Sequence, residues 1–103
     1  MSVERIESFS GSGEVFRGSV SLGVAAYHLD VYQEYLEGAM QEGRYRIPGM
    51  KRIEGTVRGN SLPVGDPLRL VTQEGHSLDF SVVNSNTGSI AVSDFVDSNG
   101  KPV

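Results

Sequence analysis

Apolar side chains at every second position are the feature that most constrains what this chain can fold into. Apolar and small residues alternate at positions 19–26, and similar alternation recurs at 52–58, 68–73 and 78–83. A period of two indicates β-strands, because successive side chains in a strand point to opposite faces. The pattern therefore predicts a mostly β chain.

The alternation changes phase in the middle of its first long run. Up to Ala26 the apolar residues occupy even positions, and after it they are Tyr27, Leu29 and Val31. A β-bulge near Ala25 and Ala26 would insert one residue and reset the alternation. We therefore predict a bulged strand here.

A helix from Tyr27 to Met40 is the alternative for the same segment. Tyr27, Val31 and Tyr35 are spaced by four residues, and Gly43 could end such a helix. Valine and tyrosine favour strands, so we prefer a strand at least as far as Tyr32.

Turn-forming clusters divide the rest of the chain into short strands. The segments LPVGDP, EGHS and NSNTG are rich in glycine, proline and asparagine, and the runs on either side of EGHS form the clearest hairpin. The fold class that follows is a mostly β, six- to seven-stranded antiparallel barrel or sandwich, with one short helix left open. A barrel is slightly preferred because closure removes sheet edges, and Gly55 could allow a tight curve or a close backbone approach. The predicted inner face consists of Val20, Leu22, Val24, Ile53, Val57, Leu68, Leu70, Leu78, Phe80 and Val82.

The length of 103 residues corresponds to one domain, 1–103, with a core of ordinary size. Residues 1–10 are ambiguous: Val3, Ile6 and Phe9 recur every third residue, as in a helical turn, but the polar residues after them suit a loose end. We leave open whether residues 1–10 and 97–103 are flexible termini.

Composition excludes several classes of protein. The chain has no cysteine, which excludes disulfides and thiolate metal sites and fits a reducing compartment. Since no run approaches the roughly 20 apolar residues that span a bilayer, and the N-terminus lacks a signal-like pattern, we expect a soluble cytoplasmic protein without membrane contact.

Catalytic signals are weak. His28, Asp30 and Tyr32 would share one face of a strand, and a histidine beside a carboxylate can act as a general base or metal ligand. The chain has only two histidines, and no further residue completes a site. We expect no enzyme, no catalytic residues, no cofactor and no metal; a hydrolytic or metal-dependent enzyme centred on His28 and Asp30 is the least favoured hypothesis.

The segment RYRIPGMKR stands out by charge. Residues 44–58 contain five cations and one anion, a net +4, whereas the rest of the chain has four cations and twelve anions, a net −8. A basic loop at 44–58 could bind a small anion or nucleotide, because arginine binds phosphate and carboxylate with two parallel hydrogen bonds. Its candidate ligands are Arg44, Tyr45, Arg46, Lys51, Arg52 and Arg58. We expect no nucleic-acid binding, because the chain as a whole is acidic.

The middle of the chain is also rich in aromatic and other large apolar residues: Tyr27, Tyr32, Tyr35, Leu36, Met40 and Tyr45. Such side chains either cover the mouth of the barrel or dock a partner. Our preferred hypothesis is a small noncatalytic β domain that binds a protein partner or its own copy through residues 32–58, with Tyr32 and Tyr35 among the anchors. The alternative is a sensor of small anions or nucleotides that uses the basic loop.

Overall fold

A computed structural model describes residues 2–40 and 43–103 of the chain. The described residues form six strands and no helix: β1 (Ser2–Arg17), β2 (Val20–Met40), β3 (Gly43–Gly59), β4 (Leu68–Thr72), β5 (Ser77–Asn84) and β6 (Ser89–Val96). The predicted mostly β fold class is confirmed. The helix considered for Tyr27–Met40 is wrong, because β2 continues as a strand to Met40.

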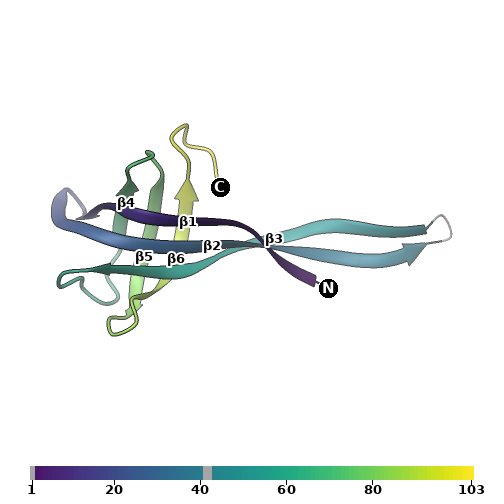
Figure 1. Cartoon of the computed structure of the whole chain (residues 1–103), viewed down its shortest axis with the longest axis horizontal. Helices are drawn as coiled ribbons and strands as arrows, with labels where there is room; N and C mark the ends of the chain where they lie inside the picture. The colour runs from purple at the N-terminus through teal and green to yellow at the C-terminus, as the bar shows by residue number, and fades with distance from the viewer. Residues whose placement is uncertain (1, 41–42) are drawn as a thin grey trace.

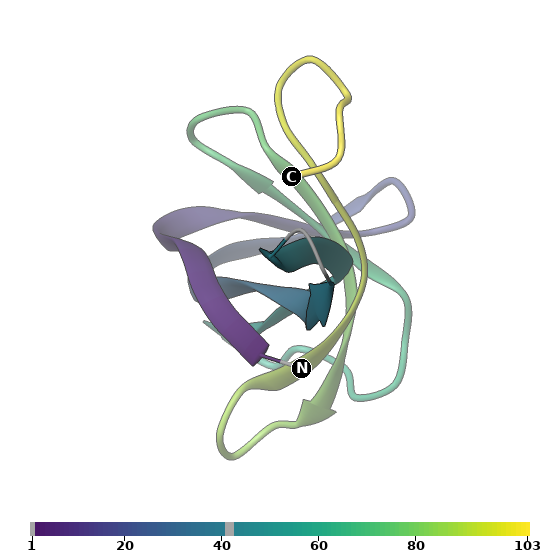
Figure 2. The ribbon, with the colours of Figure 1, turned by 90° about the vertical axis from the view of Figure 1, so that its right-hand side faces the viewer.

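The six antiparallel strands close into a ring in the order β1-β2-β3-β6-β5-β4. The long strands β1, β2 and β3 form one layer, and the short strands β4, β5 and β6 cross it at a steep angle (Figure 1). Figure 2 looks along the long strands and shows the two layers around a common interior. We call this ring the barrel; the sequence predicted this class of architecture.

The two junctions between the layers differ in length. β1 and β4 pair over four residues, from Gly13 to Phe16 of β1. β3 and β6 share only the pair Thr56–Ser89, next to a hydrogen bond of 2.9 Å from the Val57 N–H to the Gly88 carbonyl. Most of the outer edge of β3 therefore has no neighbouring strand within the described residues.

The core lies between the layers and contains most of the predicted inner face. Val57, Leu68, Leu70, Leu78, Phe80 and Val82 are buried as predicted, while Leu22 and Ile53 are partly buried against the core. The two runs around EGHS form the β4–β5 hairpin, which confirms that prediction. The core is completed mainly by residues of β1 and β2 and by Phe95 of β6.

The predicted phase change exists, but its position was wrong. β1 and β2 pair without interruption at Ala25 and Ala26, and the register shift falls at Leu22, between the pairs Val15–Gly23 and Phe16–Ser21. Gly23 has φ of 99°, a backbone conformation that glycine adopts without steric cost. Because the shift comes earlier, Ala25 points inward and Val24, predicted to be inside, is 71% exposed. Val20, also predicted to be inside, lies before the shift at the start of β2 and is 60% exposed.

Gly55 confirms the predicted close approach of two backbones. It pairs with Leu29 of β2, and a Cβ atom at Gly55 would lie 2.0 Å from the His28 carbonyl oxygen. No side chain fits in that space. Gly55 thus allows β3 to lie against β2 where both strands enter the barrel.

The two ends of the chain have defined backbone partners. Residues 2–10 belong to β1, so the helical turn considered for Val3–Phe9 is wrong; Met1 lies outside the described residues. At the other end, Val96 and Pro102 form a bridge, and the Val103 N–H donates to the Phe95 carbonyl at 2.9 Å. The segment 97–103 is therefore a tight return along β6.

Candidate functional site: the hairpin arm

β2 and β3 extend well beyond the barrel as a hairpin (Figure 1). We call residues 33–40 and 43–52 the arm. The molecule measures 57 × 30 × 20 Å, and its radius of gyration is 16.2 Å, whereas a compact domain of this length has about 13 Å. The arm accounts for this elongation.

The arm has a three-stranded base and a two-stranded tip. At the base, β1 runs along β2, with Ser2 opposite Tyr35 and Arg5 opposite Tyr32. Beyond Tyr35, β2 and β3 alone pair over five residue pairs, from Leu36–Ile47 to Met40–Gly43. Such a stretch is about 17 Å long. Residues 41 and 42, within the predicted binding segment 32–58, lie outside the described residues.

Gln33 marks the end of the apolar core at the base of the arm. Its buried side-chain amide donates to the carbonyl oxygens of Glu34 and Gly49, each at 3.0 Å. The second bond falls at a register shift, where the pair Gln33–Lys51 is followed by Tyr35–Pro48. The amide thus satisfies a carbonyl group at a bulge of β3 and closes the core against water.

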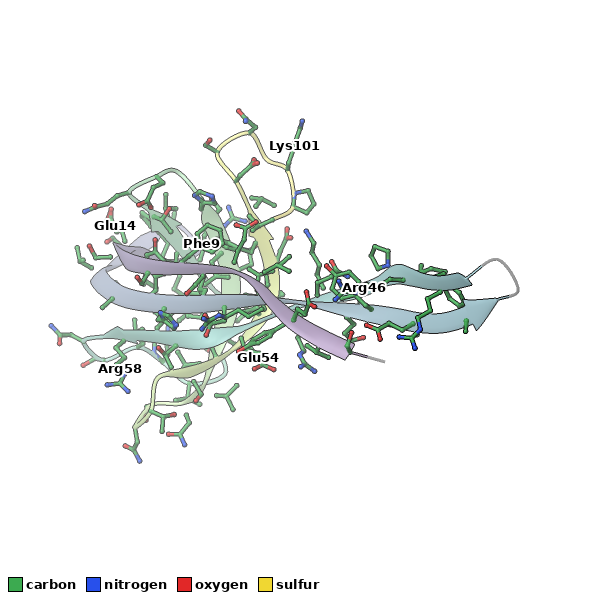
Figure 3. The ribbon with its side chains drawn as sticks, turned by 45° about the vertical axis from the view of Figure 1, so that its right-hand side comes forward. Phe9, Glu14, Arg46, Glu54, Arg58 and Lys101 are labelled. Atoms are coloured by element: carbon green, nitrogen blue, oxygen red, sulfur yellow. The ribbon has the colours of Figure 1, made fainter. Side chains whose placement is uncertain are left out.

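One face of the arm continues the core-facing side of β2 and is charged. Arg46 forms ion pairs with Glu4 and, at 3.6 Å, with Glu37, and its guanidinium lies 3.7 Å from the centre of the Tyr35 ring. The Ser2 hydroxyl donates to Glu37 at 2.8 Å. We call Ser2, Glu4, Tyr35, Glu37 and Arg46 the charged face; Figure 3 shows Arg46 on the arm, away from the barrel. The residues of the charged face thus form ion pairs, a hydrogen bond and a cation–ring contact with one another.

The opposite face of the arm is apolar. Leu36 and Ile47 are directly opposite each other, and Tyr45 lies opposite Gly38. The Tyr45 ring lies across this glycine, since a Cβ atom there would be 2.3 Å from the ring. Val3 of β1, opposite Glu34, extends the face toward the base. We call Val3, Leu36, Tyr45 and Ile47 the apolar face; their exposed fractions are 45%, 51%, 41% and 50%.

The predicted basic loop is wrong in its structure. Residues 44–58 lie in β3, so their cations are spread over about 45 Å of strand rather than gathered around a bend. Arg44 and Arg46 are on the arm, whereas Arg58 is on the barrel, where its Nε donates to the Thr87 carbonyl at 3.2 Å (Figure 3). The sequence correctly showed an excess of cationic residues in this segment. It did not show that an extended backbone holds those residues apart.

The remaining predicted residues occupy the base of the arm. Arg52 forms an ion pair with Glu54 at 3.1 Å and lies 5.9 Å from the centre of the Tyr32 ring. Lys51 is exposed and pairs with Gln33 across the ladder. Tyr32 and Tyr35 both lie in the segment that was predicted to bind. They are three positions apart in β2, so their side chains point to opposite faces of the strand.

Sequence reasoning missed five residues of the two faces: Ser2, Val3, Glu4, Glu37 and Ile47. Three of them, Ser2, Val3 and Glu4, come from a segment that looked like a terminus, and only the pairing of β1 with β2 brings them to the arm. Ile47 could have been found from alternation, since Tyr45 and Ile47 alternate with Arg44 and Arg46 in the sequence.

His28 and Asp30 share the outward face of β2, as predicted, where His28 is exposed and Asp30 is partly buried. The His28 Nε2 atom lies 3.3 Å from the Asp30 carboxylate, and Arg5 approaches the same carboxylate at 3.8 Å. Among residues 2–40 and 43–103, no three histidine, aspartate or glutamate side chains form a group that could hold a metal ion. The pair is thus a small surface cluster on β2.

Of two surface hollows, one lies outside the predicted site and the other lies within it, beside Arg44, Tyr45 and Arg46. One of about 480 Å³ is lined by Phe16, Leu68, Arg69, Asp79 and Phe80 on the barrel. Another of about 250 Å³ lies on the arm beside Tyr45, between Glu37 and Arg44. The barrel hollow contains none of the predicted binding residues.

Tyr27 is the titratable core residue with a shifted pKa. Burial raises the pKa of its phenol, and the Glu74 carboxylate, which accepts its hydrogen bond at 3.4 Å, raises this pKa further. The folded barrel therefore stabilises the neutral phenol relative to the phenolate.

No protein-family model matches the chain, and no match is found among curated proteins or solved structures. The described segments contain no helix of the length and apolarity needed to cross a membrane. Any conclusion about function must therefore come from the residues of the arm and the barrel themselves.

Proposed function

We propose that this chain is a small noncatalytic β domain that acts by binding protein, and that the arm is its binding element. The observation that carries the proposal is the apolar face. Its side chains lie outside the barrel core, on a hairpin whose tip pairs with no other strand among the described residues.

The energetics of hairpins support this role. An isolated two-stranded hairpin is marginally stable in water, and it becomes stable when a third strand or another surface covers an apolar face. In the arm the third strand, β1, reaches only the base. A protein surface that covers Leu36, Tyr45 and Ile47 would remove their apolar area from water and stabilise the hairpin of the tip.

The alternative function, a sensor of small anions or nucleotides, has less support. It requires several free cations that converge on one site, but Arg46 and Arg52 already have carboxylate and aromatic partners, and Arg58 lies on the barrel. The alternative would regain support if phosphate-bearing ligands raised the melting temperature and Arg44→Ala with Arg46→Ala abolished the rise.

Site-specific photocrosslinking tests the proposal. A photoreactive amino acid is placed at Ile47 on the arm or, as a matched control, at Val24, which is exposed on the barrel portion of β2. We expect discrete crosslinked species from position 47, in cells or at high protein concentration, and few from position 24. Equal labelling from both positions, or none from 47, would contradict the proposal.

A further inference from the structure

We infer that the partner of the apolar face is a second copy of this chain, so that two arms pack against each other through Val3, Leu36, Tyr45 and Ile47. This inference rests on the proposed function of the arm, and it adds the identity of the partner.

The distribution of charge on the arm favours a second copy. Arg44 and Arg46 alternate with Tyr45 and Ile47 along β3, so the two arginines point away from the apolar face. Two copies can therefore bring their apolar faces together without placing these cations opposite each other. An acidic partner would instead be expected to use the charged face, where Arg46 is already engaged by Glu4 and Glu37.

On the described residues of the tip, the apolar face carries no charged side chain between Leu36 and Tyr45. The Tyr45 ring fills the space over Gly38, and Leu36 and Ile47 continue the surface directly toward the base. Toward the base, the carboxylate of Glu34, opposite Val3, comes next on this side of the arm. Packing of two such tips would bury aliphatic and aromatic groups and leave the carboxylates at the rim, as in ordinary protein interfaces.

The outer edge of β3 at the base of the arm is poorly suited to association. Pro48 offers no backbone N–H, and the register shift between the pairs of Gln33 and Tyr35 distorts β3 beside it. Proline, bulges and charged side chains are features by which edge strands avoid pairing with other chains. Addition of a strand to β3 beside Pro48 is thus disfavoured, which favours contact through the apolar face.

The expected interface is small. The tip is about 17 Å long and two strands wide, which places the contact below the range of about 1,200–2,000 Å² typical of stable complexes. We therefore expect a weak dimer whose population rises from micromolar to millimolar protein. Each chain carries a formal charge of −4, so added salt should strengthen the association by screening repulsion. Contacts between arginines and an acidic surface would weaken with salt.

Sedimentation velocity on the full chain, with two charge variants, tests the inference. Ile47→Glu and Ile47→Lys should each lower the association constant by at least about tenfold, because like charges would meet within the contact. An equimolar mixture of the two variants should recover association. The control is Val24→Glu, an exposed site on the barrel portion of the same layer, which should leave association unchanged. Circular dichroism of each variant verifies that the barrel is folded.

The outcomes separate the two proposals. A monomer at every concentration, or a dimer that Ile47→Glu and Ile47→Lys leave intact, would overturn the second-copy inference. If that monomer still gives discrete crosslinks from position 47 to a different protein, the binding function of the arm stands and only its partner was wrong. If crosslinks from position 47 are also absent, the proposed function fails as well.

Discussion

The barrel and the arm share the strands β2 and β3 but differ in what covers those strands. Leu29 and Leu36 both lie in β2, yet Leu29 is fully buried under the second layer and Leu36 is 51% exposed. The difference has two causes: β4, β5 and β6 cover only the barrel portion of the long strands (Figure 1), and Leu36 lies on the opposite side of β2 from Leu29. Regular pairing alone therefore does not make a core; a second layer does.

The polar groups of the two regions differ in the same way. On the core-facing side of β2, Gln33 ends the apolar run, and the residues that follow belong to the charged face. The apolar residues of the tip then lie on the other side of the sheet. The arm thus reverses the barrel's arrangement of inside and outside, which is consistent with a surface that meets another molecule.

The largest expected contrast is between two leucines of β2. Leu29→Ala should lower the free energy of unfolding by about 2–5 kcal/mol, because it leaves a cavity in the core. Leu36→Ala should change it by less than about 0.5 kcal/mol in dilute solution, since the side chain is half exposed. Urea unfolding at low protein concentration measures both, and similar losses would show that the arm is part of the cooperative core.

A pair of glycines gives the next contrast. Gly55→Ala should cost about 1–3 kcal/mol or more, because the new methyl group meets the backbone carbonyl of His28, which cannot move without disturbing β2. Gly38→Ala should cost little, because its methyl group meets only the movable ring of Tyr45. Thermal unfolding compares the two variants; a more harmful Gly38→Ala would indicate that Tyr45 is held as firmly as the core.

Alkaline pH should affect the barrel through Tyr27. Its folded-state pKa is raised above the ordinary value, so its stabilising contribution is complete below about pH 10 and is lost as the pH rises through the folded pKa. The free energy of unfolding should therefore fall above about pH 10, and less steeply in Tyr27→Phe. Denaturant titrations near pH 8 and near pH 11 measure the free energy of unfolding of both proteins. An equal fall between these two pH values in Tyr27→Phe and in the unsubstituted protein would contradict the prediction.

The smallest effects on the free energy of unfolding should come from exposed ion pairs, and these effects should be similar in the arm and in the barrel. Arg46→Gln on the arm and Arg69→Gln on the barrel, whose Nε lies 2.8 Å from an Asp79 carboxylate oxygen, should each change the free energy of unfolding very little. Solvent screens both pairs to a similar degree. A clearly larger loss for Arg46→Gln in chemical unfolding would mean that the charged face contributes to the stability of the arm beyond a surface contact.

Sequence reasoning predicted the barrel well because its signals are local. Period-two alternation in residues 68–83 identified both strands of a hairpin and their buried faces. A glycine at position 55 of an alternating run predicted the close approach of two backbones there. The bulge position was wrong by about three residues because the pattern around Ala25 is compatible with either phase. The partner strand, which selects one phase, is not visible in the sequence of β2.

The candidate site was predicted only in part. The sequence indicated that residues 32–58 were unusual and that Tyr35, Tyr45 and Arg46 belonged to the site. It did not indicate that the segment is a straight hairpin rather than a basic loop, or that β1 supplies Ser2, Val3 and Glu4. The contribution of β1 depends on pairing between residues about thirty positions apart, which no local pattern reveals.

The sequence by itself determined that this chain forms pleated strands with an apolar side, because alternation and turn residues act over a few neighbouring positions. The tertiary structure decided which apolar side chains are buried, because burial depends on which side of the sheet they occupy and on where a second layer of strands ends. β4, β5 and β6 end before the tips of β2 and β3 (Figure 1), and the arm, with its apolar and charged faces, is the consequence.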